Sequence, residues 1–572
     1  MPRHETTRKA LVLGHDTRAF LSVIRSLGRA GIEVHVAWFD ETSPAMRSRY
    51  VAKAHGIPRY RDGDTGWKDA FAALMQTERF DLVIPCDDQR ALPLGAHRAE
   101  LERFGRIALP HPEALDVLGD KLKTAALARS LGIPVPREGI VHGREELSTL
   151  RGDFSPPLIV KPPSSYTLRD IDTRQSVRRA DTWEAAERLL DETLDDGPVA
   201  IQGLFTGVGM GVELLVHEGV PCLAFQHVRL HEPLEGGGSS YRQGVPLSPE
   251  LYDAAVKLLA AVRHTGVAMV EFKRERKSGR WVLLEVNARF WGSLPLAIAS
   301  GADFPLALFQ LLVDGRTDVP GAHRLGLRSR NLRGDARWLL TNARADRSDP
   351  TINSRPWPGI VRETAESLLS GRERSDTFTR DDPAPGVAEA VQLLREAGER
   401  GRRLASSAHA RVNPRRRRRL EAAARSDIAR ASRVLFVCKG NIARSPFAAA
   451  VAHRLLDGDR HIASAGFLHA GRRSAPEAVA AAGAWEVDLT GHRSRQVSAE
   501  LVRESDAIFV FDHGNYRGML ESFPEARDRV HLFGALDARG PLAVPDPWGR
   551  GRDVHTAIYR RIADTLAAAL TR

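Results

Sequence analysis

The sequence predicts a multidomain α/β protein in which two separate segments each form a parallel sheet flanked by helices. The chain has 572 residues, which is more than the roughly 250–300 residues that one hydrophobic core accommodates. Short apolar segments alternate with helical segments near the amino terminus, and the same alternation starts again at Arg433. Such alternation is typical of βαβ units. We therefore expect several domains, of which the first and the last contain parallel sheets.

Composition places the chain among ordinary folded proteins of a reducing compartment. Hydrophobic residues make up 42% and charged residues 27% of the chain, as in soluble globular proteins. The three cysteines, Cys86, Cys222 and Cys438, form no CxxC pair, so neither a disulfide framework nor a zinc site is expected. The amino terminus lacks the layout of a signal peptide, and no apolar run approaches the roughly 20 residues of a membrane helix. We expect a cytoplasmic protein without a membrane partner.

The net charge of +11 raises the question of a nucleic-acid partner. Basic residues are spread along the chain, and the only dense block is the arginine run at residues 415–419. No aromatic platform or base-reading motif accompanies this block. A solvated linker helix explains it, so we expect no nucleic-acid binding.

The first segment contains three strand patterns and one helical pattern. Residues 10–13 (ALVL), 32–38 and 80–85 (FDLVIP) are short apolar strands, and residues 20–27 carry a helical apolar stripe. This order predicts a parallel-sheet domain over residues 1–112.

The remaining chain divides into three further domains. Residues 113–330 mix helices with antiparallel hairpins. Residues 331–430 are helical, rich in Arg and Ala and interrupted by proline, which predicts a helical connector with a limited core. Residues 431–572 restart the βαβ pattern and are long enough for one independent domain with a doubly wound parallel sheet.

The stretch VLFVCKGNIARSP carries the most specific pattern of the last domain. A buried strand, residues 434–437, ends at Cys438, and Gly440 and Asn441 tolerate the positive φ angles of a tightly curled loop. Ser445 is expected to cap the following helix, with proline at its first position. A strand, a curled loop and a helix start direct several backbone N–H groups into one concavity, which suits a phosphate group.

Two side chains give this concavity its chemistry. The planar guanidinium of Arg444 can bind two phosphate oxygens, and the same positive field favours the nucleophilic thiolate of Cys438. An isolated cysteine after a strand is also a common core residue, and C-x5-R alone recurs by chance. The pattern predicts a phosphate-binding loop with a nucleophile at its floor, and a core thiol is the alternative.

The loop, with the preceding VLFV and the following proline, resembles the active-site loop of the low-molecular-weight protein tyrosine phosphatases. The resemblance covers residues 432–572. It includes further short motifs at SAG (464–466), HRSRQ (492–496), SDAI (505–508) and PDPWG (545–549).

The resemblance implies a role for each residue of the site. Cys438 attacks phosphorus and forms a thiophosphate ester, while Arg444 and the loop amides stabilise the equatorial oxygens. Asp546 protonates the leaving phenolate and then activates water. Ser445 assists the thiolate, and Asn441 holds the loop. The implied substrate is a phosphotyrosine protein or a small aryl phosphate.

Two further points refine this implication. Trp548 stands where the family often has an aromatic residue, usually Tyr, that lines the substrate mouth. Arsenate reduction, a sibling activity, needs additional cysteines to resolve an oxidised intermediate, and none follows Cys438. We therefore expect a phosphatase rather than an arsenate reductase.

The amino-terminal half contains a predicted hairpin that carries acidic residues. Residues 268–273 and 281–289 are strand patterns, separated by a turn signal at residues 277–279 (KSG). If the loop has three residues, Glu271 lies opposite Glu285 on the same face of the hairpin.

Glu285, Asn287 and Arg289 share one face because side chains alternate along a strand. Two facing carboxylates, those of Glu271 and Glu285, repel unless a positive group lies between them. Oxygen ligands of this kind suit Mg²⁺, which usually keeps phosphate oxygens in its shell. A solvated sheet face with mixed charges is the alternative for this set considered by itself.

Two more motifs accompany the hairpin. Residues 158–162 (LIVKP) form a strand that ends in Lys-Pro, and Asp120-Lys121 opens an earlier helix. In this order the motifs resemble the ATP-grasp superfamily. The resemblance covers about residues 8–330 and includes a Rossmann-like preceding domain, with the motif SRY at residues 48–50.

The resemblance implies a site for ATP and Mg²⁺. Lys121 and Lys161 contact the nucleotide phosphates, and the segment 202–205, with Gln202 and Leu204, forms the adenine hinge. Four residues complete the implied site: Glu271, Glu285 and Asn287, which hold Mg²⁺, and Arg289, which faces the transferred phosphoryl group.

The sequence departs from the superfamily pattern at one loop. The loop after Lys161, usually Gly-rich, is PSSY (163–166) here, which leaves its conformation open. Gly207, Gly209 and Gly211 imitate a dinucleotide fingerprint but occur in a predicted hairpin rather than at a strand-to-helix turn. No GxxxxGK[ST] motif is present, so a Walker-type NTPase is not expected.

The ATP-grasp resemblance implies that a substrate carboxylate attacks the γ-phosphate of ATP and that an amine or another nucleophile captures the acyl phosphate. We expect a bifunctional enzyme, a carboxylate ligase joined to a phosphatase. The alternative is a phosphatase regulated by a non-catalytic ATP-binding module. Arg229 and Arg242, with the loop 236–240, are candidates for the acceptor site, and a flexible hairpin loop is an equal alternative for them.

Overall fold

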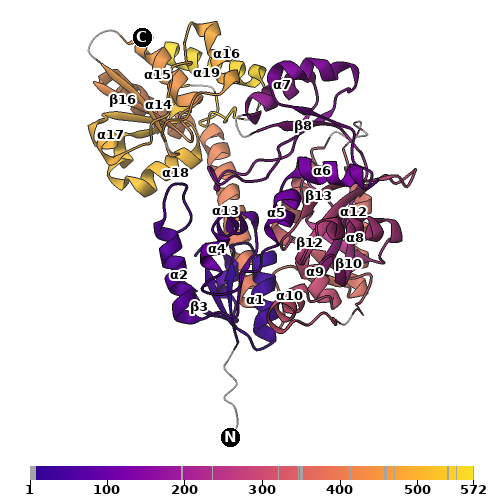
Figure 1. The fold of residues 1–572 in the computed structure, drawn as a ribbon. Coiled ribbons are helices and arrows are strands. Elements are labelled where there is room, and N and C mark those ends of the chain that lie inside the picture. Colours follow the sequence, from indigo (N-terminus) through magenta and orange to yellow (C-terminus); the bar gives the residue numbers. More distant parts are fainter. Residues whose placement is uncertain are drawn as a thin grey trace. The chain divides into compact units, whose positions relative to one another are not determined.

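The computed structural model of the chain describes residues 8–194, 197–234, 236–319, 321, 323–345, 347, 349, 352–412, 414–456, 460–468, 470–537, 540–548 and 550–570. The chain forms two compact units, Met1–Leu393 and Leu394–Arg572. Figure 1 shows the helices and strands of both. Each unit combines sheets with helices, which confirms the predicted α/β class.

The first unit begins with a four-stranded parallel sheet of order β3-β2-β1-β4. The two apolar segments ALVL and LVIP form its central β1 and its β4, and both are buried, as parallel strands covered on both faces are. The predicted strands and the predicted helix of this segment are confirmed. The elements are β1 (Lys9–Leu13), α1 (Ala19–Arg29), β2 (Glu33–Ala37), β3 (Val51–His55), α2 (Gly66–Glu78), β4 (Leu82–Pro85), α3 (Asp88–Ala96) and α4 (Arg98–Leu101).

A small antiparallel sheet of order β5-β8-β6-β7 follows in the sequence. The Asp120 carboxylate caps helix α6 and accepts hydrogen bonds from the N–H groups of Leu122 at 2.7 Å and Lys123 at 3.1 Å. The predicted helix start at Asp120-Lys121 is thereby confirmed. The elements are α5 (Pro112–Leu118), α6 (Lys121–Ser130), β5 (Glu138–Val141), β6 (Leu158–Lys161), β7 (Arg178–Ala180), α7 (Trp183–Asp191) and β8 (Val199–Gly203).

The largest sheet has seven strands in the order β13-β12-β9-β10-β11-β14-β15. Its neighbours are antiparallel except for the pair of β14 and β15 at one edge. The predicted hairpin of residues 268–289 forms the other edge. The elements are β9 (Val208–His217), β10 (Val220–His231), β11 (Tyr241–Val245), α8 (Pro249–Ala261), β12 (Gly266–Arg274), β13 (Trp281–Asn287), α9 (Leu294–Ser300), α10 (Phe304–Asp314), β14 (Arg328–Arg330), α11 (Leu332–Asn342), α12 (Trp357–Ser370) and β15 (Glu373–Ser375).

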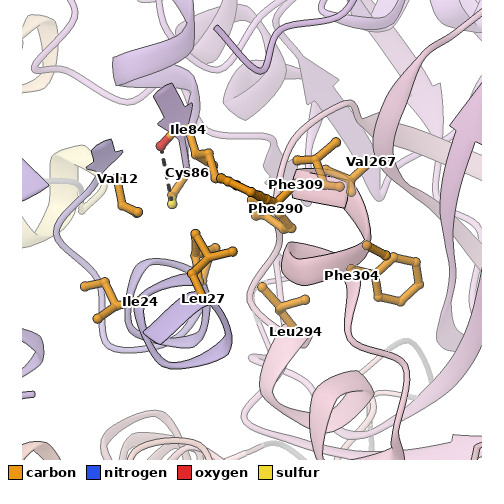
Figure 2. Packing of buried hydrophobic residues seen from close by; sticks show 14 of the residues in the cluster. Val12, Ile24, Leu27, Ile84, Cys86, Val267, Phe290, Leu294, Phe304 and Phe309 are labelled. Carbon is orange, nitrogen blue, oxygen red and sulfur yellow. Dashed lines mark hydrogen bonds between the residues drawn. The ribbon is translucent and has the colours of Figure 1, made fainter. Parts of the chain in front are cut away.

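One hydrophobic core joins the first parallel sheet to the largest sheet. Figure 2 shows Val12 and Ile24 of the amino-terminal part on one side of this core and Phe290 and Phe304 on the other. All four side chains are at most 1% exposed. Burial of large apolar side chains contributes roughly 1.5–3 kcal/mol each, so the two sheets form one body.

The SRY motif ties the amino-terminal sheet to a much later part of the first unit. The Ser48 hydroxyl donates to the Asp382 carboxylate at 2.7 Å, and the backbone N–H of Arg49 donates to its other oxygen at 3.0 Å. The Tyr50 hydroxyl donates to Asp381 at 2.9 Å. The motif therefore joins the amino-terminal sheet to two consecutive aspartates by hydrogen bonds.

The segment that we expected to be a connector with a limited core is partly sheet. Strand β15 pairs with β14 at the edge of the largest sheet, and its neighbour Asp376 forms a buried ion pair with Arg242 of β11 at 2.6 Å. Because a buried aspartate must pair with a cation, this segment packs onto the first unit. The bounds of the four domains themselves stay a prediction.

The second unit contains a parallel sheet of order β17-β16-β18-β19, which confirms the expected doubly wound sheet. Phe436, Phe509 and Tyr559 lie in its core and are fully buried. Helix α13 (Ala384–Val412) extends across the boundary between the units. The other elements are α14 (Pro414–Arg430), β16 (Arg433–Cys438), α15 (Arg444–Leu455), β17 (His461–Gly466), α16 (Pro476–Ala482), α17 (Ala499–Glu504), β18 (Ala507–Val510), α18 (His513–Ser522), β19 (Val530–Leu532) and α19 (Arg552–Leu570).

The helices that the structure describes were compared with the length and apolar composition that a membrane span requires. No individual helix there is both long and apolar enough to cross a bilayer. Only α9 and α10 together meet those criteria, and their axes are bent by 85° at the break between them.

Candidate active sites

The loop between β16 and α15 places the predicted thiol among hydrogen-bond donors. Cys438 is 3% exposed. Its Sγ lies 3.0 Å from Ser445 Oγ and accepts a hydrogen bond from the backbone N–H of Asn441 at 3.2 Å. The sulfur therefore lies at the floor of the loop, within hydrogen-bond distance of a hydroxyl and a backbone N–H.

Asn441 fixes the curl of the loop. Its φ is +52°, in the left-handed region that asparagine tolerates. The side-chain amide donates to Ser445 Oγ at 3.0 Å and to Ser464 Oγ at 2.9 Å, and its Oδ1 accepts from the backbone N–H of Arg495 at 2.7 Å. A side chain at Gly466 would lie 2.8 Å from the Asn441 nitrogen, so the SAG motif ends in glycine because the loop passes directly over it.

Arg444 is held at the loop by two carboxylates. It is 1% exposed, and its Nη1 donates to Asp512 at 2.9 Å and to the carbonyl of Val544 at 3.0 Å. Its Nη2 lies 2.7 Å from the Asp546 carboxylate. The Nε is buried and has no hydrogen-bond partner in the described part of the chain. The structure therefore brings together Arg444 and Asp546, although about a hundred residues separate them in sequence.

Two residues of this site were missed from the sequence. Asp512 follows β18, whose carboxyl end adjoins that of β16, and this strand order could have revealed it. Tyr559 gave no signal, since it lies inside a regular helix. Its hydroxyl donates to the carbonyl of Ala443 at 3.2 Å, and its ring stacks on Phe447 at 3.9 Å. Burial, with the nearby Cys438 thiol, raises the pKa of Tyr559 well above its usual range.

The expectation that Ser445 caps the following helix is wrong. The helix begins at Arg444, and the cap position belongs to Ala443, which makes no side-chain cap hydrogen bond. The Ser445 hydroxyl is engaged elsewhere, because it contacts the Cys438 sulfur and donates to the carbonyl of Ala465 at 3.3 Å. The hydroxyl is therefore part of the thiol's surroundings.

The PDPWG motif contacts Arg444 with the carboxylate of Asp546. The Trp548 ring is 54% exposed, and its backbone N–H donates to Asp546 Oδ1 at 3.3 Å. Gly549 lies outside the described residues.

In the first unit, the hairpin of β12 and β13 places Glu271 directly opposite Glu285, as predicted. The Asn287 amide donates to Glu271 at 3.1 Å and to Glu285 at 3.5 Å. Burial raises the pKa of Glu271, and the facing Glu285 adds to this effect. A buried carboxylate, that of Glu271, facing a half-buried one, that of Glu285, beside an amide oxygen is a donor set that fits a hard divalent cation such as Mg²⁺.

The register of Glu271 and Glu285 arises from a different loop length and strand pairing than predicted. The loop spans residues 275–280 rather than three residues, and a bulge after Glu271 shifts the pairing. A bulge opposes two residues of one strand to one residue of the other, and it restores the facing of Glu271 and Glu285 despite the longer loop.

Lys161 is buried and Lys121 is half-buried. The Lys121 amine donates to Ser165 Oγ at 3.0 Å, which ties it to the PSSY loop, and the Lys161 amine donates to the carbonyl of Leu284 at 2.6 Å. Burial lowers the pKa of both amines. The Gln202 amide donates to Glu138 at 2.5 Å.

A cavity brings four of the predicted residues together. Its wall contains Lys121, Glu285, Asn287 and Arg289. The other predicted residues, which do not line this cavity, are Lys161, Gln202, Leu204 and Glu271. Asp88, which the sequence did not reveal, also lines it and binds both Arg289 Nε and Nη2 at 2.9 Å. The cavity continues into an apolar part lined by Ile84, Leu109, Leu115, Leu118 and Phe290.

The two candidate acceptor arginines have different environments. Arg242 is fully buried and contacts both oxygens of Asp376, at 2.7 and 2.6 Å, so it does not face a ligand. Arg229 lies 2.5 Å from Glu271 and 3.6 Å from Glu232. Burial opposes its charge, but these carboxylates outweigh burial and raise the pKa of Arg229. Its Nε has no hydrogen-bond partner among the described residues.

The glycines of β9 make room for these side chains. Gly209 and Gly211 lie within an antiparallel strand, as predicted, and not at a strand-to-helix turn. A Cβ at Gly209 would lie 2.7 Å from Arg229 Cδ, and one at Gly211 would clash with His227. These glycines therefore serve packing rather than dinucleotide binding.

Comparisons with known proteins agree with this geometry. Residues 433–572 match the family described as low molecular weight phosphotyrosine protein phosphatase, and residues 220–334 match the family described as ATP-grasp in the biosynthetic pathway with Ter operon. The low molecular weight protein-tyrosine-phosphatase Wzb of Salmonella typhi is 35% identical over 129 residues, 22% of this chain and 85% of that protein. Wzb of Escherichia coli K12 is 34% identical over 127 residues, 22% of this chain and 84% of that protein.

Among solved structures, the L-amino acid ligase of Bacillus licheniformis is similar with a TM-score of 0.43 and 17% identity, over 56% of this chain and 78% of that chain.

Fold and site together define an α/β enzyme with a cysteine-containing phosphate-binding loop in its second unit. Through that unit the chain belongs to the low molecular weight protein-tyrosine-phosphatase family. Its first unit contains an ATP-grasp domain.

Proposed function

We propose that the second unit hydrolyses aryl phosphomonoesters, such as phosphotyrosine, through a covalent intermediate. The Cys438 thiolate attacks phosphorus, and the S–P bond forms as the bond to the aryl oxygen breaks. Asp546 gives its proton to the departing oxygen. Water then attacks the thiophosphate ester, Asp546 accepts a proton from this water, and phosphate leaves as the thiolate is regenerated.

The observation that carries this proposal is the set of contacts around the thiol. Asn441 and Ser445 both contact the Cys438 sulfur, at 3.2 and 3.0 Å. In this proposal Arg444 and the loop amides stabilise the equatorial phosphate oxygens, and the contact of Arg444 with Asp546 supports the choice of Asp546 as the acid.

The phosphatase proposal is tested with p-nitrophenyl phosphate and the full chain. Cys438→Ser is expected to abolish hydrolysis, and Asp546→Asn to lower kcat by roughly 10²-fold or more because the leaving group departs unprotonated. The exposed Asp506, which accepts hydrogen bonds from backbone N–H groups at the start of β16, provides a control in Asp506→Asn. Hydrolysis by Cys438→Ser at the rate of the unmodified chain would refute the assigned nucleophile.

We also propose that the first unit is an ATP-dependent carboxylate ligase. A substrate carboxylate attacks the γ-phosphorus of ATP, ADP leaves, and an amine or another nucleophile displaces phosphate from the acyl phosphate. Glu271, Glu285 and Asn287 offer the oxygen donors that Mg²⁺ prefers, and the cation, when bound, neutralises phosphate charge.

The other predicted residues, of which Lys121 and Arg289 line the cavity, take the roles that the ATP-grasp resemblance implies. Lys121 and Lys161 bind nucleotide phosphates, and Arg289 faces the transferred phosphoryl group. Gln202 and Leu204, at the end of β8, contact the adenine. Arg229, whose Nε has no hydrogen-bond partner among the described residues, is the candidate for the substrate carboxylate, since Arg242 is committed to Asp376.

Release of ADP across a panel of carboxylates and amines tests the ligase. A pair that supports turnover is expected, and Glu285→Gln should lower that turnover by roughly 10²-fold. Glu250→Gln, an exposed change on α8, serves as control. Tight ATP binding without turnover under every pairing would refute the ligase.

The same outcome would favour the second candidate, a phosphatase regulated by a non-catalytic ATP-binding module. Two observations favour it: the Ser-rich loop 163–166, and the ion pair of Glu271 with Arg229 at 2.5 Å, which already neutralises one carboxylate of the set. This candidate predicts that ATP changes kcat or KM for p-nitrophenyl phosphate.

A further inference from the structure

Five basic residues lie on the phosphate-binding loop and on two segments next to it. One member follows the nucleophile directly, and the others come from two segments, 471–474 and 492–496, that lie side by side. Arg473 and Arg493 form a bridge between these segments, and the Gly471 N–H donates to the Ser494 carbonyl at 2.8 Å. We name this set the basic rim, and its members are Lys439, Arg472, Arg473, Arg493 and Arg495.

The rim is anchored to the loop itself. The backbone N–H of Arg495 donates to Asn441 Oδ1 at 2.7 Å, and Lys439 is bonded through its carbonyl, which accepts from Phe467 at 2.9 Å and Leu468 at 3.2 Å. The backbone at both positions is therefore fixed close to the Cys438 sulfur, while the side chains of Lys439 and Arg495 are exposed to solvent.

Arg472 is the innermost member of the rim. Its Nη1 lies 3.1 Å from the point where a Cβ on Gly440 would be, so it rests against the phosphate-binding loop. Its guanidinium also lies 5.7 Å from the centroid of the Trp548 ring, which belongs to the motif carrying Asp546. The Nη1 is buried and has no hydrogen-bond partner in the described part of the chain. A buried donor without a partner is unfavourable, and a ligand that supplies an acceptor would satisfy it.

No carboxylate neutralises the rim within the described residues. None of its five cations lies in an ion pair there, and two acids that contact the loop, Asp512 and Asp546, both bind Arg444, at 2.9 and 2.7 Å. The rim thus keeps a net positive field at the entrance, and such a field attracts anionic ligands at close range.

We infer that the phosphatase unit selects phosphotyrosine within acidic polypeptide segments. The inference rests on the proposed phosphatase function and names its substrate class. The phosphoryl group itself is bound by Arg444 and the loop amides, so the rim is free to contact other anions. Its cations come from the loop and from the two adjacent segments beside it, and the Arg472 guanidinium rests against the loop. Aspartate and glutamate flanking a phosphotyrosine bound in the loop supply anions that complement these charges.

Binding to a full chain that carries Cys438→Ser tests the inference without turnover. Two phosphotyrosine peptides are compared, one flanked by Asp and Glu and the other by Asn and Gln at the same positions. The acidic peptide is expected to bind about tenfold more tightly at low salt. This preference should shrink to about twofold near 0.5 M salt, where exposed charges are screened.

The paired change Arg472→Gln with Arg473→Gln is expected to remove most of the preference. Arg503→Gln, an exposed change on α17, is the matched control and should keep it. In the chain with Cys438 intact, the same preference should appear in KM rather than in kcat, because the rim contacts the flanking residues and not the reacting atoms.

Equal Kd values for the two peptides at low salt would overturn the inference. So would a preference that survives both the paired change and high salt. If the paired variant fails to fold, the salt dependence of the preference for the acidic peptide, measured in the chain that carries only Cys438→Ser, tests the inference by itself. A preference confined to small aryl phosphates with a second anionic group would also overturn the peptide assignment. Acidic preference in binding without any hydrolysis by the chain with Cys438 intact would refute the phosphatase proposal and leave the inference about the rim standing.

Discussion

Arg289 and Asp88 form a bidentate ion pair in which two guanidinium nitrogens each lie 2.9 Å from one carboxylate oxygen. Arg289 follows strand β13 of the largest sheet, and Asp88 is the first residue of helix α3, just after β4. The third guanidinium nitrogen donates to the carbonyl of Phe290 at 2.9 Å. Since the fork of an arginine fits a carboxylate in only one plane, Asp88 sets the orientation of Arg289 in the cavity.

The change Asp88→Asn should therefore impair the ligase reaction. Asparagine keeps the size of the side chain but cannot accept both N–H groups as a charged fork does. We expect kcat for ADP release to fall by roughly 10- to 100-fold, as it does when a positioned group is released. The measurement is steady-state ADP release with a productive substrate pair.

Asp116→Asn, which removes an exposed ion pair with Lys123, controls for the lost charge. Unchanged kcat in Asp88→Asn would show that Arg289 does not depend on Asp88.

Asn441 combines an unusual backbone angle with three side-chain hydrogen bonds, and two substitutions separate these contributions. Asn441→Gly removes the hydrogen bonds but accepts φ of +52°, whereas Asn441→Ala removes them and adds backbone strain. Both should lower kcat for p-nitrophenyl phosphate by about tenfold or more, because the loop loses its ties to Ser445 and Ser464. Asn441→Ala should also unfold more easily than Asn441→Gly, by about 1 kcal/mol. Denaturant unfolding of the second unit measures this difference, and a more stable alanine variant would contradict the account.

Asp382 accepts hydrogen bonds from Ser48 and Arg49 of the SRY motif. Its carboxylate is 1% exposed and lies 2.9 Å from Arg25 Nε, whose side chain is 4% exposed. Asp382→Ala leaves this guanidinium buried without its partner, so we expect the free energy of unfolding of the first unit to fall by about 3–5 kcal/mol. The neighbouring Asp381 is 43% exposed, and Asp381→Ala should cost about 1 kcal/mol or less. Equal costs at the two positions would be the contrary result.

His264 makes the stability of the first unit depend on pH. The side chain is fully buried, and burial lowers the pKa of His264 to about 4, although the Val267 carbonyl works in the other direction. The unfolded chain takes up this proton near pH 6.5 and the folded chain only near pH 4. Stability is therefore full above pH 6.5 and declines as pH falls through this window, by about 3 kcal/mol in total.

Unfolding experiments at pH 7 and pH 4.5 test the contribution of His264. His264→Gln should flatten the decline, whereas His217→Gln, at an exposed position at the end of β9, should leave it unchanged. An undiminished decline in His264→Gln would assign the effect to other groups.

The local patterns of the sequence predicted the elements well because they depend on neighbouring residues. The strands at residues 10–13 and 434–437 are apolar runs, and the Asp120 cap is a local side-chain-to-backbone contact. The facing of Glu271 and Glu285 was also predicted, but from a loop of three residues. The longer loop and the compensating bulge leave no pattern in the sequence, since a bulge depends on how the whole strand pairs.

Partners that come from distant segments could not be predicted. Asp88 binds Arg289, and Asp376 binds Arg242, across long stretches of chain. Tyr559 reaches the phosphate-binding loop only through the packing of α19 against α15. Strand β15 is three residues long and polar (ERS), so neither alternation nor hydrophobicity indicated it. Tertiary pairing decides such features, and local propensity does not.

The central claim is that one chain carries two separate phosphate chemistries, and a pair of variants tests it most directly. Full chains with Cys438→Ser or Glu285→Gln are assayed for release of p-nitrophenolate from p-nitrophenyl phosphate and for release of ADP with a productive substrate pair. The account predicts that Cys438→Ser loses only the first activity and that Glu285→Gln loses only the second. Loss of both activities in either variant, or ADP release that is unchanged by Glu285→Gln, would contradict it.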